Sequence, residues 1–356
     1  MSNIKRRVSR VVKIGRVRIG GNNPVAIQSM AKAKSSDVRR VIPQIRRLEA
    51  AGCEIIRVAV KDIDDARAIA RIKQDINIPL VADIHFDYRL ALAAVAAGAD
   101  KIRLNPGNIY KPAQVRQVID AARDAGIPIR VGLNSGSVRG SGDPVRLMVA
   151  AALAYVRQIE RCKFRNIVLS LKANDAAGTI AAYRAVAPRC DYPLHLGVTA
   201  TGLPFEGMIK SCVALGSLLI DGIGDTIRIS LTDKPEEEVR VAKALLASLG
   251  LRNFGPSIIS CPTCGRCEVD LVRIVKDLEK KLGARAQTWK AAKPLTVAVM
   301  GCVVNGPGEA RHADIGIAFG KDSGLLFKKG KPVRKVGVDQ SVRILLSEMK
   351  SLERSR

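Results

Sequence analysis

The chain has 356 residues, of which 47% are apolar, and its 59 basic and 33 acidic side chains give a net charge of +26. Its length suits one barrel of about 250 residues and a second module of about 100 residues. No apolar run approaches the roughly 20 residues that cross a membrane, so the composition predicts a soluble protein and excludes a membrane-spanning one.

The positive charge is spread along the whole chain, and aromatic residues make up only 3% of it. A nucleic-acid binder would combine basic residues with a stacking motif or a recognition helix, and the sequence offers neither. We therefore expect no nucleic-acid partner. The charge suits an acidic protein partner or an anionic small substrate.

The N-terminal segment is basic but lacks the apolar core of a signal peptide. From Val8 to Gln28, apolar and polar residues alternate around the Gly20-Gly21-Asn22-Asn23-Pro24 segment, which predicts a β-hairpin. Eight cysteines in a chain of this length do not indicate disulfides, because that pattern belongs to short secreted domains. These features predict a cytoplasmic protein.

Short runs rich in Val, Ile and Leu recur along the first 230 residues and alternate with helical patterns. The predicted strands are Val25–Met30, Glu54–Val60, Leu80–Ile84, Lys101–Leu104, Ile129–Leu133, Ile167–Leu171, Leu194–Val198 and Thr226–Leu231. Helical patterns between them include Asp37–Ala51, Asp62–Asp75, Arg89–Ala97, Ala113–Ala125 and Glu236–Leu249. Eight such units predict a (β/α)8 TIM barrel. A doubly wound open sheet is the alternative, but no GxGxxG motif opens the first unit.

Polar side chains occupy the ends of these strands, where a TIM barrel carries its active site. Residues two apart in a strand share a face, and the polar residues that do so are Asp83 with His85, Arg103 with Asn105, Arg130 with Asn134, Ser170 with Lys172, and Arg228 with Ser230, joined by Arg57. Four Arg and one Lys in one lumen, with Asp83 as the acid, would be strongly penalised by burial unless an anion binds there.

We interpret this set as a site for a phosphate or diphosphate ligand, because Arg offers bidentate donors to phosphate oxygens. Inward Arg and carboxylate pairs that serve only packing are the alternative. His85 is either a ligand-binding or proton-transferring residue or a structural one.

After Leu249 the alternation of strands and helices stops, so we place a domain boundary near residue 250, with domains at 1–250 and 251–356. The second module is predicted to contain a helix over Val269–Leu282, strands over Leu295–Met300 and Asp314–Ala318, and a closing helix over Gln340–Leu352. This pattern predicts a small α+β domain.

Cysteines cluster in the second module. Cys261 and Cys264 form a CxxC pair, and Cys302 follows a predicted strand. Thiolates at this spacing indicate zinc or an iron-sulfur cluster. The fourth ligand is either Cys267, which extends the pair to CxxCxxC, or Glu309, which a Gly-Pro-Gly turn brings towards Cys302. The remaining cysteines lie singly in apolar or helical stretches, and we assign no role to Cys53, Cys162, Cys190 and Cys212.

Several longer motifs resemble one family along nearly the whole chain. They are VADIHFDYRLAL at 81–92, RLNPGNI at 103–109, GIGDTIRISL at 222–231, CPTCGR at 261–266 and GCVVNGPGE at 301–309. In this order they resemble the bacterial 4-hydroxy-3-methylbut-2-en-1-yl diphosphate synthases.

The resemblance implies a TIM barrel followed by an iron-sulfur domain, and the reductive ring opening of 2-C-methyl-D-erythritol 2,4-cyclodiphosphate in the non-mevalonate isoprenoid pathway. It implies a [4Fe-4S] cluster held by Cys261, Cys264, Cys302 and Glu309, with Cys267 outside the ligand set. It also implies a homodimer in which the cluster domain of one chain closes the barrel of the other, and ferredoxin or flavodoxin as the electron donor.

The same resemblance assigns roles to individual residues. Catalytic positions are Arg57, Asp83, Asn105 and Glu309. Substrate-binding positions are His85, Arg103, Arg130, Asn134, Lys172, Arg228, Ser230 and, in the cluster loop, Asn305.

The sequence departs from the family pattern at two loops. The family reads VTEAG after the seventh strand, with a Glu implicated in catalysis, whereas this chain carries Ala200 there. The SMTNT-like loop after the first strand reads Ser29-Met30-Ala31-Lys32-Ala33, which lacks two hydroxyls. Either Glu206 supplies the missing carboxylate, or the chain is a diverged homologue that keeps the cluster and diphosphate binding. A zinc-stabilised RNA-binding protein is the remaining alternative.

Overall fold

The computed structural model describes residues 4–137, 140–199, 202–283, 295–302, 308 and 310–354. The chain divides into two compact units, Met1–Arg252 and Asn253–Arg356. None of the described helices is both long and apolar enough to cross a membrane.

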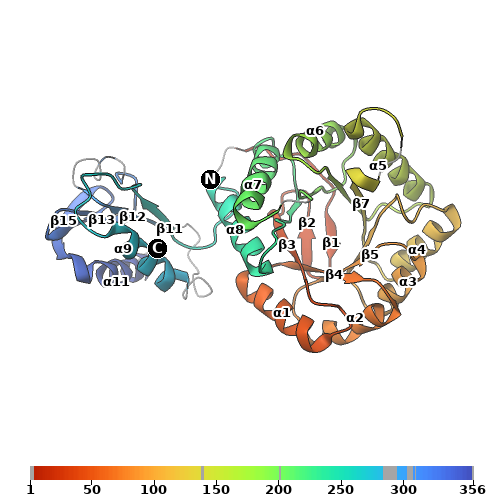
Figure 1. The fold of residues 1–356 in the computed structure, drawn as a ribbon, viewed down its shortest axis with the longest axis horizontal. Coiled ribbons are helices and arrows are strands. Elements are labelled where there is room, and N and C mark those ends of the chain that lie inside the picture. The colour runs from red at the N-terminus through yellow and green to blue at the C-terminus, as the bar shows by residue number, and fades with distance from the viewer. Residues whose placement is uncertain are drawn as a thin grey trace. The chain divides into compact units, whose positions relative to one another are not determined.

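The first unit is built around a ring of eight parallel strands (Figure 1). They are β3 (Ala26–Met30), β4 (Ile55–Val60), β5 (Leu80–Ile84), β6 (Lys101–Leu104), β7 (Ile129–Asn134), β8 (Ile167–Lys172), β9 (His195–Leu196) and β10 (Thr226–Ile227). Neighbouring strands pair in the order β8-β7-β6-β5-β4-β3-β10-β9. The ring is completed where Leu169 of β8 bridges Leu194, just before β9. The predicted TIM barrel is therefore confirmed.

Eight helices follow the strands and surround the ring, as Figure 1 shows. They are α1 (Val38–Ala51), α2 (Ile63–Asp75), α3 (Tyr88–Ala96), α4 (Pro112–Asp124), α5 (Pro144–Arg161), α6 (Ala176–Val186), α7 (Pro204–Ile220) and α8 (Pro235–Ser248), with short 3-10 turns η1 (Ser135–Ser137) and η2 (Ala187–Arg189). Several begin at an Asp whose carboxylate accepts a backbone N–H, as Asp62 does from Asp65 at 2.8 Å. Their buried apolar residues face the strands.

A two-stranded hairpin, β1 (Val12–Ile14) and β2 (Val17–Ile19), closes the amino-terminal end of the barrel. Its buried residues form one apolar cluster with inward-facing strand residues such as Ala26, Ile55 and Val168. The predicted position of the turn was wrong. The chain reverses at Gly15, in the left-handed region, whereas Gly20 is where the backbone passes close to the carbonyl of Arg10, leaving no room for a Cβ atom.

Two predicted strands were too long. Predicted strands Leu194–Val198 and Thr226–Leu231 keep regular pairing over only two residues each, in β9 and β10. The residues that follow leave the ladder and form the loops at the carboxyl end of the barrel.

The second unit contains one five-stranded sheet in the order β11-β12-β13-β14-β15. Its elements are β11 (Ser257–Ser260), α9 (Leu271–Gly283), β12 (Thr296–Met300), β13 (Ile315–Phe319), β14 (Ser323–Lys328), β15 (Lys331–Gly337), η4 (Val338–Gln340) and α11 (Ser341–Arg354). Strands β11, β12 and β13 are parallel, and β14 and β15 form an antiparallel extension that the sequence analysis missed. Both helices pack on one core with β12 and β13 (Figure 1).

Candidate functional site

A cavity of about 310 Å³ opens at the carboxyl ends of the barrel strands. The residues that line it are Met30, Arg57, Asp83, His85, Arg103, Arg130, Gly132, Asn134, Ser170, Lys172, Val198, Thr199, Arg228 and Ser230. Because residues two apart in a strand point the same way, these polar residues reach the lumen while their neighbours pack against the helices.

Most of the predicted site residues of the barrel meet in this cavity. Asn105 is the exception. It is buried after β6, and its Oδ1 accepts the N–H of Gly107 at 3.1 Å, but it is not among the described residues that line the cavity. The predicted residues Asn305 and Glu309 lie outside the described residues, as does Ala200.

Asp83 lies between two guanidinium groups. Its Oδ1 accepts from Arg103 Nη1 at 3.1 Å, and its Oδ2 is 3.5 Å from Arg57 Nε. Burial alone would raise the pKa of Asp83, but the attraction of Arg57, Arg103 and Arg130 outweighs burial and holds the pKa far below its usual range. Asp83 is therefore an anion that orients two cations.

Burial lowers the pKa values of several cations in the cavity. Burial, reinforced by the neighbouring guanidinium groups, lowers the pKa of Lys172 and of Arg130 well below the usual values. Burial also lowers the pKa of Arg57 to about 10. An anion in the cavity would reverse these shifts, because it stabilises the charged forms.

Two inward-facing glycines make room for the cations. A Cβ atom on Gly132 would lie 2.8 Å from Arg103 Nε, and one on Gly197 would lie 2.7 Å from Lys172 Nζ. Any larger residue would displace these side chains. The cationic lumen thus depends on the absence of two side chains as well as on the presence of the charged ones.

Met30, which strand periodicity did not single out, also contacts Arg57. Arg57 Nε and Nη2 donate to Met30 Sδ at 3.2 and 2.9 Å. A thioether is a weak acceptor, so these donors are well suited to exchange it for a phosphate oxygen.

A second buried carboxylate was also missed. Glu238, in the first turn of α8, lies beside Arg228, with the carboxylate oxygens 3.4 and 3.5 Å from Nη2. The three consecutive Glu residues at 236–238 contained the signal, since one of them falls on the buried side of the helix. Asp83 is therefore not the only acid near the cations.

Glu206, which was one candidate to replace the missing family Glu at position 200, does not belong to the described lining of the cavity. It is exposed in the first turn of α7. His85 is exposed at the mouth, and its ring centroid is 5.8 Å from that of Phe86.

Two cysteines of the second unit lie just after the ends of neighbouring parallel strands. Cys261 follows β11, and Cys302 follows β12 after Gly301. Gly301 N donates to Cys261 Sγ at 3.3 Å. A Cβ atom on Gly301 would lie 2.5 Å from Cys267 Sγ and 3.4 Å from Cys261 Sγ, so only glycine allows the sulfurs to approach here.

The loop between the cysteines is exposed around Cys264, and Thr263 adopts a left-handed backbone conformation with φ of 62°. That conformation is costly for a β-branched residue and is typical of functional loops. None of the eight cysteines forms a disulfide. Across the described residues, which leave out Glu309, no three His, Cys, Asp or Glu side chains lie close enough together to hold a metal ion. Thiols from two strand ends nevertheless fit a metal that prefers sulfur ligands.

Comparison with known families accounts for both units. The signature of the GcpE TIM-barrel domain matches residues 9–243, and that of the GcpE protein C-terminal domain matches residues 257–351. The chain belongs to the GcpE family.

Curated GcpE-type relatives are similar over nearly their whole length. A 4-hydroxy-3-methylbut-2-en-1-yl diphosphate synthase (flavodoxin) from Caldicellulosiruptor saccharolyticus is 51% identical over 97% of this chain and 99% of the relative. The enzyme of the same name from Fusobacterium nucleatum is 47% identical over 97% of both chains.

Among solved structures, a dihydropteroate synthase from Xanthomonas albilineans is 14% identical, with a TM-score of 0.50, over 67% of this chain and 98% of its own. At that identity the likeness concerns the barrel fold alone.

Proposed function

We propose that the chain is a 4-hydroxy-3-methylbut-2-en-1-yl diphosphate synthase that opens the ring of 2-C-methyl-D-erythritol 2,4-cyclodiphosphate. The observation that carries the proposal is the cationic cavity, in a chain about half identical to enzymes of that name. A cyclic diphosphate would supply negative charge to Arg130 and Lys172, which form no ion pair among the described residues, and would add to the single carboxylate of Asp83 that Arg57 shares with Arg103. The same names support flavodoxin as the electron donor, although a ferredoxin would serve the same chemistry.

The residues of the cavity would bind and orient the diphosphate. Arg103 and Arg57 are held in place by Asp83, so their donors are arranged before the substrate arrives. Asn134, Ser170 and Ser230 add neutral polar groups at the same mouth. His85, exposed at the edge, is placed to bind the substrate or to transfer a proton.

In this proposal a [4Fe-4S] cluster is held by Cys261, Cys264, Cys302 and Glu309. The cluster would supply the single electrons that amino-acid side chains cannot provide. Overall, the reaction takes up two electrons and two protons, breaks one carbon-oxygen bond of the ring and one carbon-hydroxyl bond, forms a carbon-carbon double bond and releases the hydroxyl oxygen as water, while the ring oxygen stays on the diphosphate. Asn305 is proposed to approach the substrate from the cluster loop, and the working form is proposed to be a homodimer.

The proposal predicts that the anaerobically purified protein contains iron and acid-labile sulfide and converts the cyclodiphosphate with reduced flavodoxin. Cys264→Ser should lose most of the iron, because one thiolate ligand is removed, whereas Cys162→Ser should keep it. Metal and sulfide analysis, with product detection by mass spectrometry, provides the measurement. A colourless protein that contains zinc would rule the proposal out.

Restoring the family residue with Ala200→Glu separates a full synthase from a diverged homologue. A full synthase turns over without the change, and a diverged one binds the cyclodiphosphate but gains turnover only when Glu is restored. Unchanged turnover in the variant would mean that position 200 has no catalytic role in this chain.

A further inference from the structure

Glu238 is a buried carboxylate at the start of α8, and only 1% of its side chain is exposed. Its neighbour Glu237 is 43% exposed and pairs with Arg240 at 3.4 Å. A buried carboxylate is costly unless hydrogen bonds and opposite charges surround it. Glu238 must therefore be stabilised by the groups around it.

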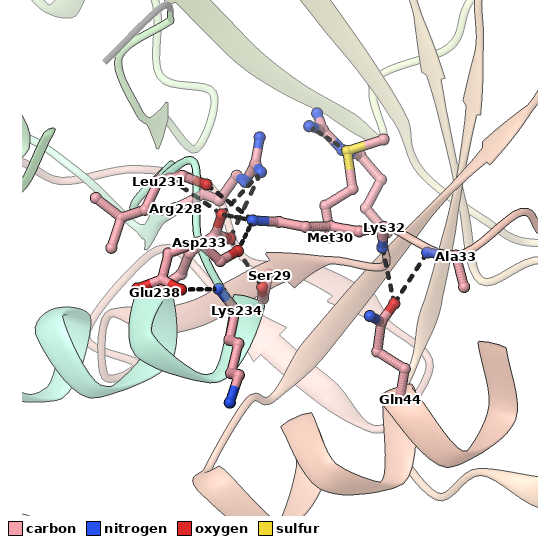
Figure 2. A network of polar contacts seen from close by, with 11 residues as sticks. Ser29, Met30, Lys32, Ala33, Gln44, Arg228, Leu231, Asp233, Lys234 and Glu238 are labelled. Atoms are coloured by element: carbon pink, nitrogen blue, oxygen red, sulfur yellow. Dashed lines mark hydrogen bonds and ion pairs between the residues drawn. The ribbon is translucent and has the colours of Figure 1, made fainter. Parts of the chain in front are cut away.

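Two hydrogen bonds join the carboxylate to the first barrel strand and to the loop after the last one. Oε2 accepts from Ser29 Oγ of β3 at 3.1 Å, and Oε1 accepts from the N–H of Leu231, after β10, at 3.1 Å. Figure 2 shows Glu238 between these two segments. The carboxylate is thus held by three separate parts of the barrel: α8, β3 and the loop after β10.

Lys32 strengthens the same arrangement from the loop after β3. Its Nζ donates to the carbonyls of Leu231, at 2.8 Å, and of Asp233, and lies 3.7 Å from Glu238 Oε1 (Figure 2). Gln44 holds that loop from α1, since its Oε1 accepts the N–H of Lys32 at 2.8 Å. Lys32 therefore connects the loop after β3 with the loop after β10, beside Glu238.

Arg228 lines the cavity and is also in contact with the Glu238 carboxylate. Its Nη2 approaches both carboxylate oxygens. A long guanidinium side chain loses conformational freedom when it binds an anion, and a fixed carboxylate behind it reduces that cost.

We propose that Glu238 is a positioning residue, which holds the Arg228 guanidinium in the orientation that binds the diphosphate group of the substrate. The inference rests on the proposed function, because that function makes the ligand of the cavity a diphosphate. Lys32, at a position where the family motif has a different residue, contributes by fixing the loop segment to which Glu238 is bound.

Glu238 can change the affinity of the cavity for an anion in two opposite ways. As a negative charge near the cavity, it repels the anion, so its removal would tighten binding. As a support for Arg228, it pre-arranges a donor, so its removal weakens binding. The direction of the change therefore decides between the two roles.

The test measures inorganic diphosphate binding to the full-length, cluster-loaded protein by titration calorimetry. Glu238→Gln keeps the size of the side chain but presents an amide to Arg228, and we expect about tenfold weaker binding. The matched control Glu237→Gln removes the same charge from the exposed side of the same helix and should change the affinity by less than about twofold. Unchanged or tighter binding by Glu238→Gln overturns the inference.

A double-mutant cycle identifies the partner. In the Arg228→Gln background, Glu238→Gln should have no further effect on binding, because the group that it positions is gone. An effect of the same size in both backgrounds would mean that Glu238 acts on the whole mouth and not through Arg228, and would also overturn the inference.

Ser29→Ala provides a second route if Glu238→Gln does not fold. It removes one hydrogen bond to Glu238 and no charge, and we expect about threefold weaker binding of diphosphate. An unchanged affinity contradicts the positioning role. If the wild-type protein itself does not bind diphosphate, the proposed function fails and the inference fails with it, which is a different outcome from a failure confined to the variants.

Discussion

His195 is fully buried inside the barrel, and its Nδ1 is 2.7 Å from Thr226 Oγ1. Burial, reinforced by the positive charges of Arg130, Lys172 and Lys101, lowers the pKa of His195 well below its ordinary value. His195 is therefore neutral in the folded barrel at pH values where an unfolded chain, with a His pKa of about 6.5, binds a proton.

This difference predicts how the stability of the barrel depends on pH. Below about pH 6.5 the unfolded state binds the extra proton, so the free energy of unfolding falls as the pH falls, by up to about 1.4 kcal/mol per pH unit for this group. His195→Gln should reduce that slope, and denaturant unfolding at several pH values between about 5 and 6.5 measures it. His312→Gln supplies the control, because it makes the same substitution at an exposed residue of the second unit and leaves the barrel residues unchanged. Equal slopes in the wild type and His195→Gln would show that His195 titrates normally in the fold.

At the scale of residues, strand periodicity predicted which side chains enter the lumen. Strand alternation correctly predicted that three residues point into the lumen, Arg57, Asp83 and Lys172, because it does not depend on tertiary packing. Met30 was missed because an apolar residue at the end of a strand is indistinguishable from core. Glu238 was missed because its direction depends on how α8 packs against β3, and one helix pattern does not specify that.

At the scale of elements, the hairpin β1–β2 forms the floor of the barrel. Ile14 is fully buried against the inward-facing strand residues, whereas Val11, just before the hairpin, is 58% exposed. The barrel interior therefore has an apolar floor and a cationic mouth.

We expect Ile14→Ala to lower the free energy of unfolding of the barrel by about 3 kcal/mol, because it leaves a cavity in that floor. Val11→Ala, which removes apolar atoms from an exposed site, should cost less than about 0.5 kcal/mol. Denaturant unfolding followed by circular dichroism compares the two. Similar small losses in both variants would mean that the hairpin is not a structural part of the barrel.

Elements were predictable where burial imposes a regular pattern. Strands β5 and β6 match their predicted bounds because they are buried on both faces. Strand β15 was missed because most of its seven residues are exposed, three of them are basic and one is Pro332, a composition that is typical of an edge strand but also of a loop. The hairpin turn was misplaced because glycines at 15 and at 20–21 are equally good turn formers in the sequence.

At the scale of the whole molecule, the net charge of +26 bears on the proposed electron donor. An acidic flavodoxin is attracted to such a protein over distances comparable with the Debye length, about 10 Å at 0.1 M salt. Electrostatic attraction of this kind mainly increases the rate of encounter.

The rate of electron transfer from reduced flavodoxin should therefore fall several-fold as the salt concentration rises from about 0.05 to 0.3 M. Stopped-flow absorbance of the flavodoxin measures it. A small neutral reductant provides the control, since its rate should not depend on salt in this way. A salt-independent rate with flavodoxin would contradict an electrostatic encounter.

The pairing of β3 with β10 also has a consequence for synthesis on the ribosome. Ile27 needs Ile227 as its partner, so the second edge of β3 is unpaired until about 200 further residues have been translated. At typical synthesis rates this takes roughly 10 to 40 seconds. During that time the backbone N–H and C=O groups on this edge of β3 are open to pairing with other strands, which makes the nascent chain prone to aggregation until β10 is made.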